Sequence, residues 1–241
     1  MNVGFVLAAY KEELNLKELL NSIFSNVDNP KIVIVDDSPE NLVKNILSEF
    51  KDITYIHRGK KLGRGSAVLR GMKEILNFKN IDIIIEIDTD LSHDPNEIPK
   101  NIKKFKKEEL DLLISGRYLK ESKILNWTID RRILSFSANF LAKSFLKVPV
   151  SDYTNAFRIY SNRAAKHIVQ NCGSIGDGFI ILSEILVELY YNNFKVGETQ
   201  TVWKNRVRGK STVSFKEIFQ SLIGLIKIYE KKNKIKKSRK L

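Results

Sequence analysis

Two carboxylates one residue apart are the most chemically suggestive feature of this sequence. Asp88 and Asp90 follow an apolar run, Ile83–Ile87, that is typical of a buried strand, although Glu86 interrupts it. Pro95, a favourable first residue for a helix, comes shortly afterwards. Carboxylates at this spacing can turn toward one cation, and a Mg²⁺ or Mn²⁺ held by one or two carboxylates keeps places for phosphate oxygens. The alternative is a solvated turn with an Asp cap.

A glycine-rich basic segment, Arg58–Ser66, is a candidate anion-binding loop. It contains three glycines and leads into a predicted helix at Ala67–Phe78, and the N-terminus of a helix favours an anion. Its spacing matches neither a Walker A loop nor a GxGxxG motif, so an ordinary solvent loop is an equal alternative. A second such segment, Arg206–Thr212, ends in Gly-Lys-Ser-Thr, but Lys204 stands where a P-loop requires its first glycine.

The elements that must position these groups alternate along the first half of the chain. Apolar runs predict strands, and helical spacing predicts helices between them, which indicates an α/β domain with a parallel sheet. Ligands bind at the carboxyl ends of strands in such sheets, so the acidic turn and Arg117 are expected at one edge. Asp37 or Ser38 is expected to cap a helix that begins at Pro39. The predicted strands are Val3–Ala9, Lys31–Val35, Ile53–Ile56, Ile83–Ile87 and Leu112–Ser115.

The second half of the chain is expected to add longer helices. Arg131-Arg132 opens a helical stretch, Ile133–Leu146, whose apolar residues cover more than one face, which suggests contact with lipid or another chain. A further helix, Ile180–Tyr191, carries Glu184 and Glu188. The other predicted elements are a helix at Pro95–Lys107, a turn and strand at Ser151–Tyr160, a strand at Phe194–Trp203 and a helix at Phe215–Tyr229.

Composition bounds the classes of protein to consider. The chain has 241 residues, 43% of them hydrophobic, and a net charge of +13. Such a charge suggests nucleic acid, an anionic membrane face or phosphorylated substrates as partners. A single cysteine, Cys172, excludes an internal disulfide and a zinc cluster. The sequence predicts no signal peptide and no transmembrane helix, since it shows neither a basic n-region nor about 18 consecutive apolar residues.

The C-terminal region combines an apolar helix with a basic tail. Seven of the last eleven residues, Lys231–Leu241, are Lys or Arg. Such a tail is either a disordered solubilising end or, after an apolar helix, part of a helix lying on an anionic membrane. We therefore divide the chain into a main α/β domain, 1–212, and an amphipathic helix with a basic tail, 213–241, expected to attach to a membrane.

Taken together, four motifs resemble family 2 glycosyltransferases of the GT-A type, and most closely the dolichyl-phosphate (polyprenyl-phosphate) mannosyltransferases. The resemblance extends from about Val3 to about Thr212. It implies an α/β GT-A fold, with a mostly parallel sheet flanked by helices. The motifs are Ile87–His93, Ser115–Tyr118, Arg131–Phe140 and Ser151–Arg158.

The resemblance also implies roles for individual residues. Asp88, Asp90 and Ser92 would bind a metal cofactor, Mg²⁺ or Mn²⁺. Arg131, Arg132 and Ser135 would hold the phosphate of a lipid acceptor, and Asp90, Arg117 and Arg131 would act in catalysis. The nucleotide sugar would contact Ala8, Tyr10, Glu12, Val35, Asp37, Asp88, Thr89, Asp90, Arg117, Arg206 and Lys210.

Two departures from the family pattern lie at donor contacts. The first motif reads Ala8-Ala9-Tyr10-Lys11-Glu12, without the usual proline and asparagine. The loop that closes over the donor has Thr212 where a lysine is usual, and Lys210 could supply that charge. Other donors, UDP-glucose or a UDP-N-acetylhexosamine, or another acceptor therefore remain as alternatives. A basic nucleic-acid-binding protein would explain the charge but not the paired carboxylates.

The expected reaction is inverting transfer of mannose from GDP-mannose to dolichyl or another polyprenyl phosphate. A phosphate monoester, with a second pKa of about 6, is largely ionised at pH 7, so no catalytic base is expected. Loss of turnover in Glu184→Gln with both substrates still bound would contradict that expectation. We expect the protein at the cytoplasmic side of a membrane, attached peripherally by its tail or by an anchoring partner subunit, and we expect no nucleic-acid partner.

Overall fold

A seven-stranded sheet forms the centre of the computed structural model, which describes residues 1–205, 208 and 215–239, with backbone alone for 215–219. Its strands are β1 Val3–Ala9, β2 Lys31–Asp36, β3 Ile53–His57, β4 Ile83–Glu86, β5 Leu112–Gly116, β7 Arg158–Ser161 and β8 Val196–Gln200. They lie in the order β3-β2-β1-β4-β7-β5-β8, and only β7 runs antiparallel to its neighbours. The carboxyl ends of β1, β2, β4 and β5 therefore meet at one edge, and the predicted mostly parallel α/β sheet is confirmed.

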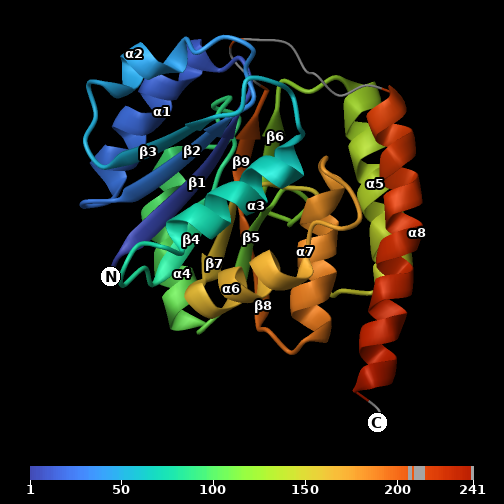
Figure 1. The fold of residues 1–241 in the computed structure, drawn as a ribbon. Coiled ribbons are helices and arrows are strands. Elements are labelled where there is room, and N and C mark those ends of the chain that lie inside the picture. The colour runs from blue at the N-terminus through green and yellow to red at the C-terminus, as the bar shows by residue number, and fades with distance from the viewer. Residues whose placement is uncertain (206–207, 209–214, 240–241) are drawn as a thin grey trace.

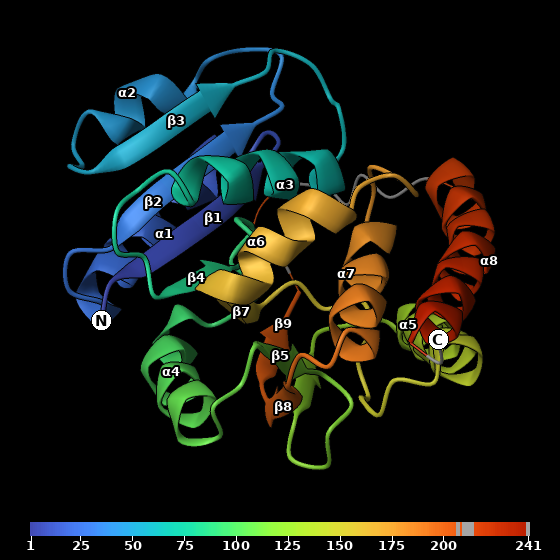
Figure 2. The same cartoon turned by 60° about the horizontal axis from the view of Figure 1, so that its bottom comes forward.

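Helices cover both faces of the sheet (Figures 1 and 2). Successive side chains of a strand point to opposite faces of the sheet and pack into two hydrophobic cores. Phe5 and Leu7 of β1 belong to one core, and Val6 belongs to the other. The first core is completed by α1 Glu13–Asn26, α2 Val43–Leu47 and α4 Ile98–Lys107, which follows the 3-10 turn Pro95–Glu97. The second core is completed by α3 Arg64–Ile75, α5 Ile129–Leu146, α6 Asn162–Asn171, α7 Ile180–Tyr191 and α8 Phe215–Ser238.

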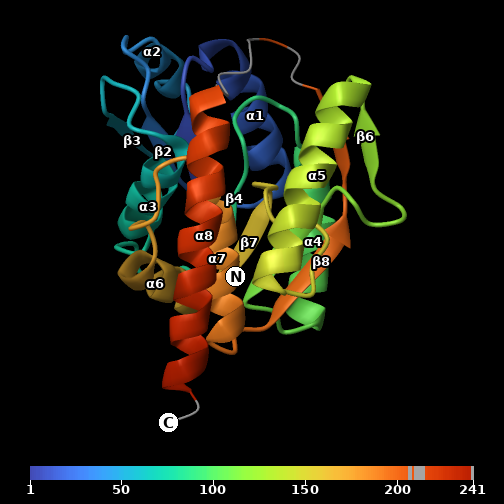
Figure 3. The ribbon, with the colours of Figure 1, turned by 90° about the vertical axis from the view of Figure 1, so that its right-hand side faces the viewer.

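Helices α5 and α8 lie together at one side of the molecule, as Figure 3 shows from that side. Gly224 lets α8 approach α7, because a Cβ atom there would lie 2.6 Å from Cγ1 of Ile180. Ile228 is fully buried in the second core. Lys231 forms ion pairs with Glu184 at 3.0 Å and Glu188 at 2.9 Å, both on α7. The side of α8 that faces the domain is therefore fixed by packing and by charge.

The C-terminal segment differs from its expected form. The predicted helix ended at Tyr229, but α8 continues to Ser238, so most of the basic tail is helical. Lys232 is buried and donates a hydrogen bond of 2.6 Å to the carbonyl of Phe145 on α5. Lys231 and Lys232 are thus used inside the protein, contrary to the expectation that the whole tail faces a membrane. The part of the chain that the structure describes contains no helix long and apolar enough to span a bilayer.

The predicted strand Phe194–Trp203 is wrong as a single element. Its first part is β8 of the main sheet, whereas β9, Val202–Lys204, pairs with β6, Lys123–Leu125, in a separate two-stranded sheet. The strand breaks at Thr201, which donates a hydrogen bond of 2.6 Å to Glu97. Apolar periodicity cannot show such a change of sheet, because both pieces are half-buried strands.

Candidate active site

The acidic turn lies beyond β4 at the carboxyl edge of the sheet and is held by its neighbours. Thr89 donates a hydrogen bond of 3.1 Å to the carbonyl of Ala8 at the end of β1. The backbone N–H of Ser92 donates to Oδ1 of Asp90 at 3.1 Å, and the Ser92 carbonyl accepts from the N–H of Lys204 at 2.9 Å. Asp90 and Ser92 are buried and Asp88 is half-buried. The turn is thus tied to β1 and β9.

Arg64, at the start of α3, is a site residue that the sequence did not reveal. Its guanidinium donates to Oδ1 of Asp88 at 3.0 and 3.1 Å and lies 2.7 Å from Oε1 of Glu86. Burial alone would raise the pKa of Asp88, but Arg64 and His93 outweigh burial and hold it well below its usual range. The interruption of the β4 apolar run by Glu86, and the Gly63-Arg64-Gly65 sequence, are the signals that could have indicated this pair.

The acidic turn fits a hard divalent cation. Asp88 and Asp90 provide carboxylate oxygens, which Mg²⁺ and Mn²⁺ prefer, and an ionised carboxylate has more acceptor sites than Arg64 occupies. Nε2 of the buried His93 lies 3.5 Å from the second oxygen of Asp88. No cluster of three or more acidic, His or Cys side chains among the described residues could hold a metal ion alone. A cation here would therefore need further oxygen ligands besides these side chains.

Asp37, which follows β2, organises the glycine-rich basic loop beyond β3 instead of capping a helix. Its carboxylate accepts from Arg58 at 2.5 and 2.8 Å, and from the backbone N–H groups of Leu62 at 2.8 Å and Gly63 at 3.1 Å. The helix predicted to begin at Pro39 is therefore wrong, and α2 begins only at Val43. Gly63, directly before Arg64, adopts a φ of +101°, which glycine tolerates. A side chain at this position would also collide with Asp177.

The remaining donor candidates from the first two strands surround the same edge. Tyr10 follows β1 and lies 5.6 and 5.5 Å from the ammonium groups of Lys11 and Lys61. Glu12 is buried and accepts a hydrogen bond of 2.6 Å from Asn15, which opens α1. The side chain of Val35 is fully buried in the second core, so only its backbone can face a ligand.

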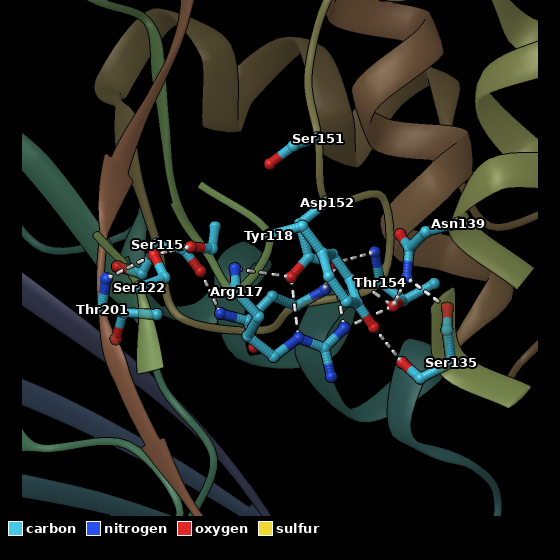
Figure 4. Close-up of polar contacts among 12 residues, drawn as sticks. Ser115, Arg117, Tyr118, Ser122, Ser135, Asn139, Ser151, Asp152, Thr154 and Thr201 are labelled. Atoms are coloured by element: carbon cyan, nitrogen blue, oxygen red, sulfur yellow. Dashed lines mark hydrogen bonds and ion pairs between the residues drawn. The ribbon is translucent and has the colours of Figure 1, made fainter. Parts of the chain in front are cut away.

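Arg117 follows β5 and is buried in an ion pair with Asp152, which precedes β7. Its Nε and Nη2 donate to the two carboxylate oxygens at 2.7 and 2.9 Å, and Nη2 also donates to Thr154 at 2.7 Å (Figure 4). Burial alone would lower the pKa of Arg117, but Asp152 outweighs burial and raises it. The antiparallel direction of β7 brings Asp152 to this edge, because the start of β7 lies beside the end of β5.

The three acceptor candidates lie on the first two turns of α5, and two of them reach this site. The hydroxyl of Tyr118 donates to Ser135 at 2.6 Å (Figure 4). The guanidinium of Arg131 donates to Oδ1 of Asn205 at 2.8 Å and stacks on aromatic rings described below. Arg132 is exposed and donates instead to the carbonyl of Ile124 at 2.6 Å. Arg131 and Ser135 are therefore better placed than Arg132 to act beside Arg117.

One further candidate, Glu184, lies outside this constellation. Glu184 is fully buried, accepts a hydrogen bond of 3.1 Å from the N–H of Gly173 and pairs with Lys231. Arg206 and Lys210, the predicted donor contacts of the second basic loop, lie outside the residues that the structure describes.

The chain resembles several characterised proteins. It is 35% identical over 237 residues to the dolichol-phosphate mannosyltransferase of Pyrococcus furiosus, with 92% of this chain and 62% of that protein covered. It is 27% identical over 238 residues to the dolichol-phosphate mannosyltransferase of Mycosarcoma maydis, with 93% and 78% covered. An undecaprenyl-phosphate mannosyltransferase of Micrococcus luteus is 26% identical over 164 residues, 66% of each protein. The chain thus spans less than two thirds of the Pyrococcus protein.

Solved structures share the fold. Glucosyl-3-phosphoglycerate synthase of Mycobacterium tuberculosis, crystallised with Mn²⁺, UDP-glucose and phosphoglyceric acid, superposes with a TM-score of 0.69 at 16% identity, with 95% of this chain and 80% of that chain covered. The same enzyme with Mg²⁺ and UDP gives a TM-score of 0.67 at 14% identity, with 95% and 79% covered. The family model described as Glycosyl transferase family 2 matches residues 5–169, more than half of this sequence. The chain therefore belongs to glycosyl transferase family 2.

Proposed function

We propose that this chain transfers mannose from GDP-mannose to dolichyl or another polyprenyl phosphate, with inversion at the anomeric carbon. The observation that carries the proposal is the junction of α5 with the Arg117 segment, formed by the bond from Tyr118 to Ser135 at 2.6 Å. Through this bond Ser135, a proposed ligand of the lipid phosphate, lies at the edge of the sheet that also carries the acidic turn. The names of the relatives in Pyrococcus, Mycosarcoma and Micrococcus support the same acceptor class.

At the donor end, the chain must bind a diphosphate and stabilise it as it leaves. A Mg²⁺ or Mn²⁺ held by Asp88 and Asp90, with Ser92 beside them, would supply Lewis-acid stabilisation of the developing negative charge. Arg64 holds Asp88 in place and keeps it ionised, so that the carboxylate is ready for a cation. Asp37 orders the basic loop through Arg58 and the N–H groups of Leu62 and Gly63, and Lys61 of this loop, beside Tyr10, would add positive charge near the donor.

At the acceptor end, the phosphate itself is the nucleophile and needs positioning more than deprotonation. A phosphate monoester with a second pKa of about 6 is largely ionised at pH 7. Arg131 is suited to grip it in a bidentate way, and Ser135 offers a hydroxyl donor. Glu184, the residue considered as a base, is engaged by Lys231 instead, which supports a mechanism without an obligatory base.

We also propose that the acceptor is met at a membrane surface formed by α5 and α8. Their exposed apolar side chains flank the acceptor candidates on α5, and an exposed apolar patch marks contact with a membrane or another protein. Basic side chains on the second half of α8 would contact anionic headgroups. The α5–α8 surface consists of Ile129, Ile133, Leu134, Phe136, Phe140, Leu141, Phe145, Leu222, Ile223, Ile226 and Tyr229.

One experiment tests the donor and the acceptor together. The purified full chain is incubated with a polyprenyl phosphate and a panel of labelled nucleotide sugars, with Mg²⁺, with Mn²⁺ and with a chelator. The proposal predicts metal-dependent, organic-extractable label from GDP-mannose. Label from a UDP-sugar but not from GDP-mannose would contradict the assignment of GDP-mannose as the donor. Label that stays in the aqueous phase would contradict the assignment of a lipid as the acceptor.

A further inference from the structure

The only two tryptophans of the chain, Trp127 and Trp203, lie in contact with each other. Their ring centroids are 4.6 Å apart with the planes at 66°, and both residues are buried. Trp127 lies two residues before the start of α5. Trp203 is the central residue of β9, where it is in register with Ile124 of β6. The small two-stranded sheet thus brings the two rings together.

Arg131 stacks on both tryptophans. Its guanidinium carbon lies 4.6 Å from the ring centroid of Trp127 and 5.4 Å from that of Trp203. Both distances are within the range of attractive cation–π contacts, which gain strength in buried surroundings. A stacked guanidinium keeps its edge N–H groups in a fixed plane, and this plane determines where a bidentate phosphate can sit.

The same aromatic pair is connected to the donor side of the site. The guanidinium of Arg117 lies 5.5 Å from the centroid of Trp127. Trp203 forms an isolated β-bridge with His93, and the next residue of β9, Lys204, donates its N–H to the carbonyl of Ser92 at 2.9 Å. The rings therefore lie between the acidic turn and α5. They connect Arg131 to the donor edge and so determine its position relative to that edge.

We propose that Trp127 and Trp203 form a positioning platform for the acceptor phosphate, and that Trp127 acts through Arg131. This inference rests on the proposed function. The two phosphate-bearing substrates repel each other, so the reaction needs the acceptor phosphate held at a set distance from the donor. The faces of the two rings attract the guanidinium and hold it in place without neutralising its charge. Arg117 is anchored separately, by Asp152.

Trp127→Leu removes the aromatic face, and Trp127→Phe retains one. The Trp127 N–H has no hydrogen-bond partner within the described part of the chain, so Trp127→Phe sacrifices no bond seen there. With GDP-mannose saturating and geranyl phosphate varied, we expect Trp127→Leu to lower kcat/KM for the acceptor about 10- to 100-fold, the scale of a misplaced reactant. The donor KM should stay the same, and Trp127→Phe should recover most of the loss.

A double-mutant cycle separates positioning from general damage to the fold. In the Arg131→Ala background, Trp127→Leu should cause no further loss of kcat/KM, because its effect passes through Arg131. Phe24→Leu serves as a matched control, since it removes an aromatic ring from the remote stacked pair with Phe50, whose centroids are 5.7 Å apart. This control should leave the acceptor kinetics unchanged.

Tryptophan fluorescence gives a readout that does not depend on turnover, because both tryptophans belong to the platform. Geranyl phosphate should change the emission of the wild-type protein, geraniol should not, and Arg131→Ala should abolish the response. Equal losses from Trp127→Leu in the wild-type and Arg131→Ala backgrounds, or unchanged acceptor kinetics, would overturn the platform while leaving the proposed function intact. A wild-type protein that neither responds to geranyl phosphate nor transfers mannose to it would overturn the proposed function, and the platform with it.

Discussion

At the scale of single residues, buried ion pairs decide which groups stay charged at the edge of the sheet. Asp88 and Asp152 are kept ionised by Arg64 and Arg117, against the effect of burial. An uncompensated charge in the same places would shift its pKa and become neutral. The site is therefore charged before any substrate arrives, which is the condition for electrostatic stabilisation without reorganisation.

The first prediction concerns the proposed metal-binding carboxylates. Asp88→Ala or Asp90→Ala should lower the rate of transfer about 100-fold or more, because each removes a ligand of the cation that stabilises the leaving group. Transfer of labelled mannose measures the rate, and circular dichroism checks the fold. Asp94→Ala is a matched control. This carboxylate lies in the same loop, accepts a hydrogen bond of 3.0 Å from the N–H of Asn96 and is not a proposed metal ligand. An active Asp88→Ala, Asp90→Ala double variant would show that the cation is held elsewhere.

The second prediction concerns the pair of Arg117 and Asp152. Asp152→Asn leaves a buried arginine without its counter-charge, so the free energy of unfolding at pH 7 should fall by about 3–5 kcal/mol. Burial alone would raise the pKa of Asp152, but Arg117 outweighs burial and lowers it. A lowered folded pKa contributes stability that is complete above the unfolded value of about 3.9 and is lost as the pH falls through the folded pKa.

Urea unfolding of the wild type and Asp152→Asn from pH 7 to pH 3 measures this dependence. The difference in unfolding free energy between the two proteins should stay constant above about pH 5 and shrink below about pH 4. Comparison of the two proteins removes the contributions of Asp88 and Asp111, whose pKa values are also lowered. A difference that does not change with pH would show that the ion pair is not the source of the stability.

At the scale of elements, the sequence predicted what depends on local pattern. The first four strands and helix α7 were found close to their predicted bounds, because continuous apolar runs and helical spacing report burial directly. The acidic turn was placed correctly for the same reason, since it ends such a run. The resemblance to a family supplied Arg131 and Ser135, which no periodicity could have assigned.

What the sequence could not predict depends on contacts between distant segments. The insertion of β7 antiparallel between β4 and β5 brings Asp152 to Arg117, and no local pattern encodes such a pairing. Arg64 lies in a segment that was interpreted equally as an anion-binding loop or a solvent loop, and its pairing was missed because Glu86 and Asp88 are more than twenty residues away. The small sheet of β6 and β9 was also missed, since three-residue strands carry too little periodicity to be recognised.

The third prediction belongs to the contact between α8 and α7. Lys231→Met leaves Glu184 buried without its cation, so the unfolding free energy should fall by about 2–4 kcal/mol, less than for a fully buried pair because Lys231 is 21% exposed. Lys234→Met is the matched control, because Lys234 is exposed on the same helix. Chemical denaturation of both variants measures the effect. Equal stability of the two variants would mean that packing around Ile228 alone holds α8 in place.

At the scale of the whole molecule, one side combines the acceptor candidates with apolar and basic surface. Arg131 and Ser135 lie on α5, which packs beside α8 (Figure 3), and both helices carry exposed apolar side chains. A lipid phosphate that reaches Arg131 from a bilayer would therefore approach from the side that the proposed membrane surface covers.

The last prediction tests whether this side binds an anionic membrane. Lys234 and Lys237 are exposed on the second half of α8, and the exposed Arg239 directly follows it. Each basic residue near an anionic leaflet contributes about 1 kcal/mol. Replacing all three by Gln, a good helix former, should weaken binding to phosphatidylserine-containing vesicles roughly 10- to 100-fold at physiological salt. Lys231 and Lys232 remain in place, so the contacts of α8 with α7 and α5 are retained.

A matched variant removes the same charge from the opposite side of the molecule. Lys103, Lys106 and Lys107 are exposed on α4, which Figure 2 shows far from α5 and α8. Their replacement by Gln should leave vesicle flotation close to that of the wild type, because the same change in net charge then falls away from the membrane. The α8 variant should lose activity on vesicle-borne polyprenyl phosphate and keep it on soluble geranyl phosphate. Equal vesicle binding by the two triple variants would place the membrane contact on another surface, or make it a consequence of net charge alone.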